Sequence, residues 1–312
     1  MAKRTEPIMA SPPYEVGATT LRDGRTTGWA CFGDPTGDPV FWFHGSPGAR
    51  AQLPGDTNQL AIERRLRIIG VERPGTGDST FIAHEKVLDF VDDVTQVADD
   101  LELEQFGAIG LSGGGPFVLG LAHEHPTRMR SGVVIGGVGP TRGPDAIISH
   151  TLLLVPAAAV LERVRQPIGS VIGAAIRTLA PWGAPFLKAF FVLEWGDRDA
   201  MGNSPQTSQQ LLADLIDAAR RSGVRAPIED LILFGRHWGF ELGDIKVPIT
   251  FWGGTSDPIV PYVHAERQSK RVPGAKLRTI EHRGHFAGYT EPHDIFDSIR
   301  EQWPIVRSSR TA

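Results

Sequence analysis

A serine flanked by glycines is the residue of this sequence best suited to covalent chemistry. Ser112 lies in the run Gly110-Leu111-Ser112-Gly113-Gly114, between the apolar, strand-like segment Phe106–Leu111 and the apolar, helix-like segment Gly113–His123. A serine in a sharp strand-to-helix turn projects its hydroxyl outward, and the residues two positions away must be small to avoid a clash. The run therefore predicts a nucleophilic serine, although the same glycines also suit a turn that binds nothing.

A serine hydroxyl becomes a nucleophile when a base takes its proton and an acid orients that base. His285 follows the last expected strand, and Asp257 follows the strand expected at Val247–Trp252. Because the carboxyl ends of parallel strands share one edge of a sheet, we expect Ser112, Asp257 and His285 to converge there. The alternatives that we rank lower are His282 and His44 as the base and Asp230 and Asp244 as the acid.

The elements that position these residues follow from the alternation of apolar runs. Short apolar strands alternate with helix-like segments, which predicts a mostly parallel sheet covered by helices on both faces. The expected strands are Glu15–Leu21, Thr26–Phe32, Pro39–Phe43, Leu66–Val71, Phe106–Leu111, Ser131–Ile135, Val247–Trp252 and Ala275–Glu281. The expected helices of this core are Thr57–Arg65, Val87–Leu103, Gly113–His123 and Asp294–Gln302.

The alternation stops between residues 141 and 243, where the sequence is rich in Leu, Ala and Val and predicts no strand. The expected helical blocks there are Asp145–Val164, Ile168–Leu179, Ala184–Leu193, Thr207–Ser222 and Ile228–Trp238. We therefore expect an α/β core made of residues 1–140 and 244–312, with a helical cap inserted at 141–243.

These motifs together resemble the α/β-hydrolase family, over nearly all of the chain except the insertion. The order Ser112, Asp257, His285 is that family's order of nucleophile, acid and histidine. The run His44-Gly45-Ser46-Pro47-Gly48 is similar to its His-Gly loop, and residues 73–79 resemble its turn after the fourth strand. The resemblance implies an α/β-hydrolase fold, a cap domain, and an oxyanion hole formed by the backbone N–H groups of Ser46 and Gly113.

Two departures narrow the chemistry that the resemblance implies. Family members that open epoxides or remove halides carry Asp at the position of Ser112, so that chemistry is disfavoured. Proline iminopeptidase-like members usually have Trp after the nucleophile, where this chain has Gly113, which weakens the peptidase interpretation.

Aromatic residues of the insertion suggest an apolar substrate pocket. The residues that we expect to line it, together with His44 of the His-Gly loop, are Trp182, Phe190 and Trp238. The competing interpretation is that these aromatic side chains form the core of the cap itself. Three acidic residues of the insertion could bind a substrate amino group, although a solvated loop is the simpler interpretation of Glu194, Asp197 and Asp199.

Composition excludes several other classes of protein. With 32 Lys and Arg against 36 Asp and Glu, the net charge of −4 provides no general positive field for nucleic acid. The single cysteine, Cys31, excludes an internal disulfide and a cysteine-rich zinc site. The most apolar stretch, Leu152–Leu161, is far shorter than the ~20 residues of a membrane-spanning helix. The segment Met1–Val16 has no apolar run, so we expect no secretory signal and a cytoplasmic location.

No cofactor or metal is expected. Gly137 and Gly139 faintly suggest a dinucleotide loop, but Arg142 stands at the place of the third glycine. The expected function is a serine hydrolase that cleaves a carboxylic ester with a small to medium apolar acyl group through an acyl-enzyme. The alternatives are an aminopeptidase or amidase, a carbon–carbon bond hydrolase or perhydrolase, and a ligand-binding protein without turnover. The expected partner is a small-molecule substrate, and the sequence makes no prediction of the oligomeric state.

Overall fold

The central element of the fold is a sheet of eight strands. The computed structural model describes residues 11–163, 214, 216–218, 225–286 and 291–303. The strand order is β1-β2-β4-β3-β5-β6-β7-β8, and all neighbours are parallel except the pairs β1–β2 and β2–β4. The strands are β1 (Glu15–Thr20), β2 (Thr26–Gly33), β3 (Asp38–Phe43), β4 (Leu66–Val71), β5 (Phe106–Leu111), β6 (Met129–Ile135), β7 (Ile249–Gly254) and β8 (Lys276–Ile280).

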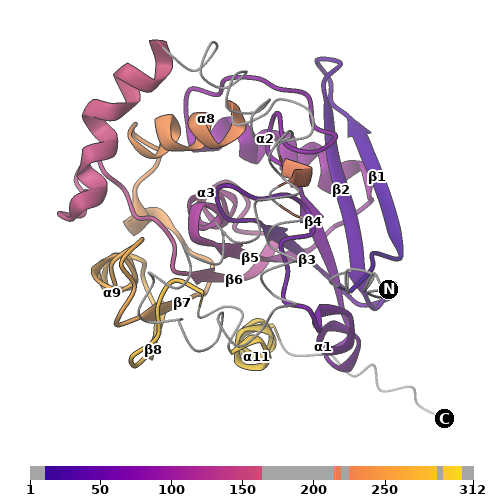
Figure 1. Cartoon of the computed structure of the whole chain (residues 1–312). Helices are drawn as coiled ribbons and strands as arrows, with labels where there is room; N and C mark the ends of the chain where they lie inside the picture. The colour runs from indigo at the N-terminus through magenta and orange to yellow at the C-terminus, as the bar shows by residue number, and fades with distance from the viewer. Residues whose placement is uncertain (1–10, 164–213, 215, 219–224, 287–290, 304–312) are drawn as a thin grey trace, which may run out of the picture.

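Helices cover both faces of this sheet (Figure 1). The core helices are α1 (Thr57–Glu63), α2 (Val87–Asp100), α3 (Gly115–Glu124), α9 (Val263–Arg271) and α11 (Pro292–Gln302). Along β3, Phe41 and Phe43 pack in the cluster that contains α2 and α3, whereas Val40 and Trp42 pack in the cluster that contains α1 and α11. Successive side chains of a strand point to opposite faces, so a strand covered on both sides is apolar at every position.

The segment between β6 and β7 consists of helices joined by turns and loops in the part that the structure describes, and it contains no strand there. It contains η2 (His150–Leu153), the helix over 154–163, α8 (Arg225–Phe234) and η4 (Leu242–Asp244). Two residues of α8, Leu233 and Phe234, pack in the same hydrophobic cluster as α2 and α3, so this helix is attached to the core. The division into core and cap at residues 141 and 243 stays a prediction.

The expected sheet is confirmed strand by strand: β4 and β5 have the expected bounds, and the ends of the other strands differ by at most two residues. The expected helix at Asp145–Val164 is wrong at its start, because the chain turns first into η2, where the Ser149 side chain accepts a hydrogen bond from the Thr151 N–H. The helix expected at Ile228–Trp238 is α8, which ends at Phe234, directly before Gly235. The helices expected at 168–179 and 184–193 lie outside the described residues.

Candidate active site

Ser112 lies in a sharp turn at the carboxyl end of β5. Its φ of 53° is in the left-handed region, and the chain continues directly into η1 (Ser112–Gly114) and α3. The turn requires glycine on both sides of the serine. A Cβ atom on Gly114 would lie 2.2 Å from the Phe43 carbonyl oxygen, and one on Gly110 would lie 2.6 Å from the Gly114 carbonyl oxygen. Close backbone approach, which only glycine allows, thus holds the Ser112 hydroxyl at the edge of the sheet.

The structure brings Ser112, His285 and Asp257 into one hydrogen-bonded chain. Nε2 of His285 lies 2.7 Å from Oγ of Ser112, and Nδ1 of His285 lies 2.7 Å from Oδ2 of Asp257. Because a carboxylate only accepts, Nδ1 carries the proton and Nε2 is left to accept the hydroxyl proton of Ser112. An imidazole held in this tautomer can act as a general base toward the serine.

Asp257 is fixed by its own turn after β7. Its second oxygen, Oδ1, accepts hydrogen bonds of 2.8 Å from the backbone N–H groups of Ile259 and Val260. The carboxyl group is almost completely buried, with 1% of its side chain exposed, and the imidazole of His285 is 6% exposed. Hydrogen bonds to the charged form stabilise a buried carboxylate, so Asp257 is suited to orient His285.

Two residues expected to supply backbone N–H groups lie beside Ser112. Ser46 and Gly113 line the same cavity as Ser112. Gly113 lies in the first turn of the η1–α3 segment, where N–H groups have no intrahelical partner. Within the described ranges, the Ser46 N–H makes no hydrogen bond either. Backbone N–H donors next to a nucleophilic serine are what an oxyanion hole requires.

His44 holds the loop rather than facing this space. It is 1% exposed, and its Nδ1 lies 2.8 Å from the Gly45 carbonyl oxygen. Burial, and next the positive charge of Arg73, lowers the pKa of His44 well below its usual range, so the ring is neutral. The expectation that His44 contacts substrate is not met, because its ring is bound to the backbone of its own loop.

The cavity beside Ser112 has a volume of about 320 Å³ and an apolar wall. The described residues that form this wall are Val138, Leu153, Leu154, Leu231, Phe234, Ile259 and Val260. Polar groups at the wall are few, namely His150 and Thr151 of η2 besides Ser46 and Ser112. The cavity therefore suits an uncharged, apolar group next to the serine.

The other residues considered from the sequence lie elsewhere. Trp238 is buried in the core and packs against Phe240, with ring centroids 6.0 Å apart, so the expectation that it lines the pocket is not met. Trp182 and Phe190 lie outside the described residues, as do the acidic residues at 194, 197 and 199. His282 and Asp244 are exposed, and Asp230 is paired with Arg73, so none of these three replaces His285 or Asp257.

Sequence reasoning missed the wall residues of η2 and α8. Phe234 touches the nucleophile turn, since a Cβ atom on Gly113 would lie 3.0 Å from its ring. No motif marks Phe234, Leu231 or Leu154, because any apolar helix face has the same pattern. Arg73 was noted only as part of a turn motif, although it proves to contact the His44–Gly45 backbone.

The glycine loop and the His, Cys, Asp and Glu side chains are the groups that could hold a cofactor or metal. The Gly137–Gly139 loop already bonds to protein, because the Gly139 N–H donates to His264 Nδ1 (2.9 Å) and the Gly137 carbonyl accepts from Gln268 (3.1 Å). In the part of the chain that the structure describes, no group of three or more His, Cys, Asp or Glu is arranged to hold a metal ion. None of its described helices is both long and apolar enough to cross a membrane.

Comparisons with known proteins agree with this architecture. Residues 38–292 match the family model described as the alpha/beta hydrolase fold. The chain is 25% identical over 276 residues to a 2-hydroxymuconate semialdehyde hydrolase of Pseudomonas putida, a match that covers 87% of this chain and 88% of that protein. It is 27% identical over 130 residues to a proline iminopeptidase of Arabidopsis thaliana, but this match covers only 40% of this chain and 33% of the other.

Solved structures share the fold at low identity. The esterase RhEst1 from Rhodococcus sp. ECU1013 superposes with a TM-score of 0.66 at 18% identity, over 92% of this chain and 97% of that one. A bromoperoxidase from Bacillus anthracis gives a TM-score of 0.69 at 18% identity, over 93% and 100% of the two chains. From its family match and its eight-stranded, mostly parallel sheet, this chain belongs to the alpha/beta hydrolase fold family and is a hydrolase of that fold.

Proposed function

We propose that this protein is a serine hydrolase that cleaves carboxylic esters with a small to medium apolar acyl group. The observation that carries the proposal is the chain of 2.7 Å contacts from Ser112 through His285 to Asp257. Ser112, at one end of this chain of contacts, lines an apolar cavity of about 320 Å³. A cavity of this size at a nucleophile accommodates one acyl group of modest length.

The proposed reaction proceeds through an acyl-enzyme. Ser112 Oγ attacks the ester carbonyl carbon while His285 Nε2 takes the hydroxyl proton. The N–H groups of Ser46 and Gly113 stabilise the oxyanion, and His285 then gives its proton to the departing alkoxide. Water attacks the acyl-enzyme, again with His285 as the base, and releases the carboxylic acid and the free serine. Asp257 holds the imidazole and stabilises its positive charge throughout.

A carbon–carbon bond hydrolase is the second candidate. It is favoured by the relative from Pseudomonas putida, whose match spans nearly the whole chain. A muconate semialdehyde carries a carboxylate, which calls for a cation in the pocket. No Lys or Arg is among the described residues that line the cavity, and His150 is the only basic group there. This wall supports the ester proposal over the carbon–carbon bond alternative.

A peptidase is supported less well than either. The match to the proline iminopeptidase covers only a third of that protein, and no carboxylate is among the described wall residues to bind a substrate amino group. A ligand-binding protein without turnover would not need the hydrogen bonds that align His285 with Ser112.

The proposal is tested with a fluorophosphonate probe and a substrate panel. The intact mass of the wild-type protein should increase by one adduct, and Ser112→Ala should show none. Ser269→Ala, a change of the same size on α9, should label like the wild type. Ser112→Ala should also lower kcat for p-nitrophenyl esters by about 10⁴–10⁶-fold with little change in Tm.

The panel separates the candidates. It contains short and medium acyl esters, prolyl amides with a free amine, and a dienoate substrate for carbon–carbon bond cleavage. The proposal predicts the highest kcat/KM on an ester of an apolar acid. A higher value on the dienoate would replace it with the second candidate, and labelling that survives in Ser112→Ala would refute the nucleophile.

A further inference from the structure

Two side chains hold the loop that carries the Ser46 N–H, one from the turn after β4 and one from the continuation of the loop itself. Arg73 donates from Nη1 to the His44 carbonyl oxygen (2.6 Å) and from Nη2 to the Gly45 carbonyl oxygen (2.7 Å). Gln52 accepts from the Gly45 N–H (2.6 Å) and donates to the Pro47 carbonyl oxygen (3.0 Å). The peptide group that joins Gly45 to Ser46 is thus held by Arg73, and the peptide groups His44–Gly45 and Pro47–Gly48 around it are held as well, which fixes the direction of the Ser46 N–H.

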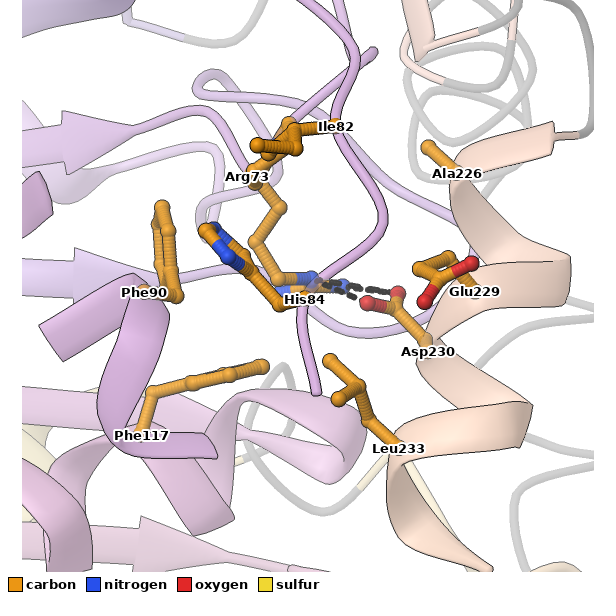
Figure 2. Close-up of a pocket in the computed structure, with 10 residues that line it drawn as sticks. Arg73, Ile82, His84, Phe90, Phe117, Ala226, Glu229, Asp230 and Leu233 are labelled. Carbon is orange, nitrogen blue, oxygen red and sulfur yellow. Dashed lines mark hydrogen bonds and ion pairs between the residues drawn. The ribbon is translucent and has the colours of Figure 1, made fainter. Parts of the chain in front are cut away.

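The orientation of Arg73 is set in turn by α8. Nε of Arg73 donates to Oδ1 of Asp230 over 2.9 Å, and Nη2 donates to Oδ2 over 2.8 Å. The side chains of this pair are only 3% and 7% exposed. Figure 2 shows Arg73 reaching from the core toward Asp230 on α8, with Phe117 nearby. A planar guanidinium bound along one edge by a carboxylate presents its remaining donors in a fixed direction.

The same helix forms part of the substrate wall. Leu231 and Phe234 of α8 line the cavity beside Ser112, and Asp230 lies in the same helix at the contact with Arg73. The helix α8 therefore contributes both to the wall of the cavity and, through Asp230 and Arg73, to the position of the loop that carries the Ser46 N–H. Among the described residues, the other ionisable side chains that line the small cavity beside the pair are His84 and Glu229, and His84 bonds to Asp93.

We infer that Arg73 and Asp230 are positioning residues. Asp230 of α8 orients Arg73, and Arg73 holds the loop so that the Ser46 N–H points at the oxyanion. The inference rests on the proposed function of this site. Neither residue touches the substrate. Without the Asp230 carboxylate, the guanidinium can turn away from the carbonyl groups of His44 and Gly45, and the loop loses its alignment. The serine, histidine and apolar wall stay in place, so the loss falls on the transition state rather than on substrate binding.

The test compares Asp230→Asn with Glu229→Gln. Each variant replaces a carboxyl group of α8 by an amide of the same size, and of these two carboxyl groups Asp230 is the one with described hydrogen bonds from Arg73. For an apolar ester, Asp230→Asn should lower kcat by about ten- to a hundredfold, with less than about a threefold change in KM. Glu229→Gln should leave both constants close to those of the wild type.

A second readout separates positioning from general loss of structure. The inhibition constant of an alkyl boronic acid, which forms a tetrahedral adduct with the serine, should rise in Asp230→Asn by the same factor as kcat/KM falls. The inhibition constant of an alkyl amide of the same length, which mimics the ground state, should not change. If Asp230→Asn does not fold, Asp230→Glu provides the same comparison, because it keeps the charge and displaces the carboxylate.

The outcomes are distinct. Unchanged kcat and boronic acid affinity in a folded Asp230→Asn would overturn the inference, and so would equal weakening of both inhibitors. If the wild type binds the boronic acid but hydrolyses no ester, the proposed function fails. The inference is then still decided by the boronic acid comparison alone.

Discussion

At the scale of single residues, Asp257 has a role that its contacts define in detail. One oxygen faces His285 and the other accepts from two backbone N–H groups, so the carboxylate cannot rotate without breaking three hydrogen bonds. A carboxylate accepts at both oxygens, so this arrangement matches the tautomer of His285 that carries its proton on Nδ1.

The change Asp257→Asn tests this directly. An amide that keeps its oxygen toward the backbone N–H groups presents its NH₂ to Nδ1 of His285, which then becomes an acceptor and leaves the proton on Nε2. Since Nε2 can then no longer take the proton of Ser112, kcat for an ester should fall by about 10⁴-fold with little change in KM. Steady-state kinetics at pH 7.5 measures both constants. A rate near that of the wild type would mean that another acid orients the histidine.

How well the sequence predicts a residue depends on how local its partners are. The glycines around Ser112 and the loop residues Asp257 and His285 are recognisable because turn geometry dictates residue types at fixed spacing. Arg73 and Asp230 are 157 positions apart, and no spacing rule links them. Trp238 illustrates the reverse error, since an aromatic residue in the insertion serves equally well as core, where it lies, or as pocket wall.

At the scale of elements, α8 lies between the cavity beside Ser112 and the hydrophobic core. Phe234, at its end, is 2% exposed, packs on Phe117, and lies against the turn of Gly113. It is a wall of the cavity on one side and part of the hydrophobic cluster on the other. Its size therefore limits the depth of the cavity beside Ser112.

A smaller side chain at this position should change the selectivity for acyl length. Phe234→Leu enlarges the cavity, so the ratio of kcat/KM for a longer acyl ester to that for the acetate should rise by about tenfold. A series of p-nitrophenyl esters from acetate to decanoate measures this ratio. Phe240→Leu is the matched control, since Phe240 packs on Trp238 and is not in the described wall. An equal shift in the control, or none in Phe234→Leu, would contradict this assignment.

Elements of the core were predictable because the central strands β3 to β7 are mostly apolar and Gly or Pro marks many of the turns between elements. The hairpin β1–β2 and the strands β3 to β8 follow these signals. The start of the helical segment after β6 was not predictable from the sequence. Its position depends on Ser149, which caps η2 and also bonds to His264 of α9 over 2.8 Å. That contact joins residues 115 positions apart, so local propensity does not reveal it.

At the scale of the whole molecule, buried ionisable groups make opposing contributions to stability. Burial raises the pKa of Glu72 to about 7 and that of Asp214 well above its usual range. Burial lowers the pKa of His264 to about 4 and that of His44 well below normal. The two carboxyl groups therefore destabilise the fold as the pH rises above the pKa that they have in the unfolded chain. The two histidines destabilise it as the pH falls below about 6.5, the pKa of histidine in the unfolded chain.

Glu72→Gln should separate these two contributions. The wild-type carboxyl is protonated in the fold at pH 5 and ionised at pH 8, beside Arg50 at 3.3 Å, whereas Gln stays neutral. The wild type should therefore lose stability between pH 5 and pH 8 while the variant does not. The difference in free energy of unfolding, variant minus wild type, should increase by about 2–3 kcal/mol over this range. Urea unfolding at pH 5, 6, 7 and 8 measures the difference, with the exposed Glu241→Gln as control. A difference independent of pH would show that Glu72 is already ionised in the fold at pH 5, with Arg50 compensating its burial.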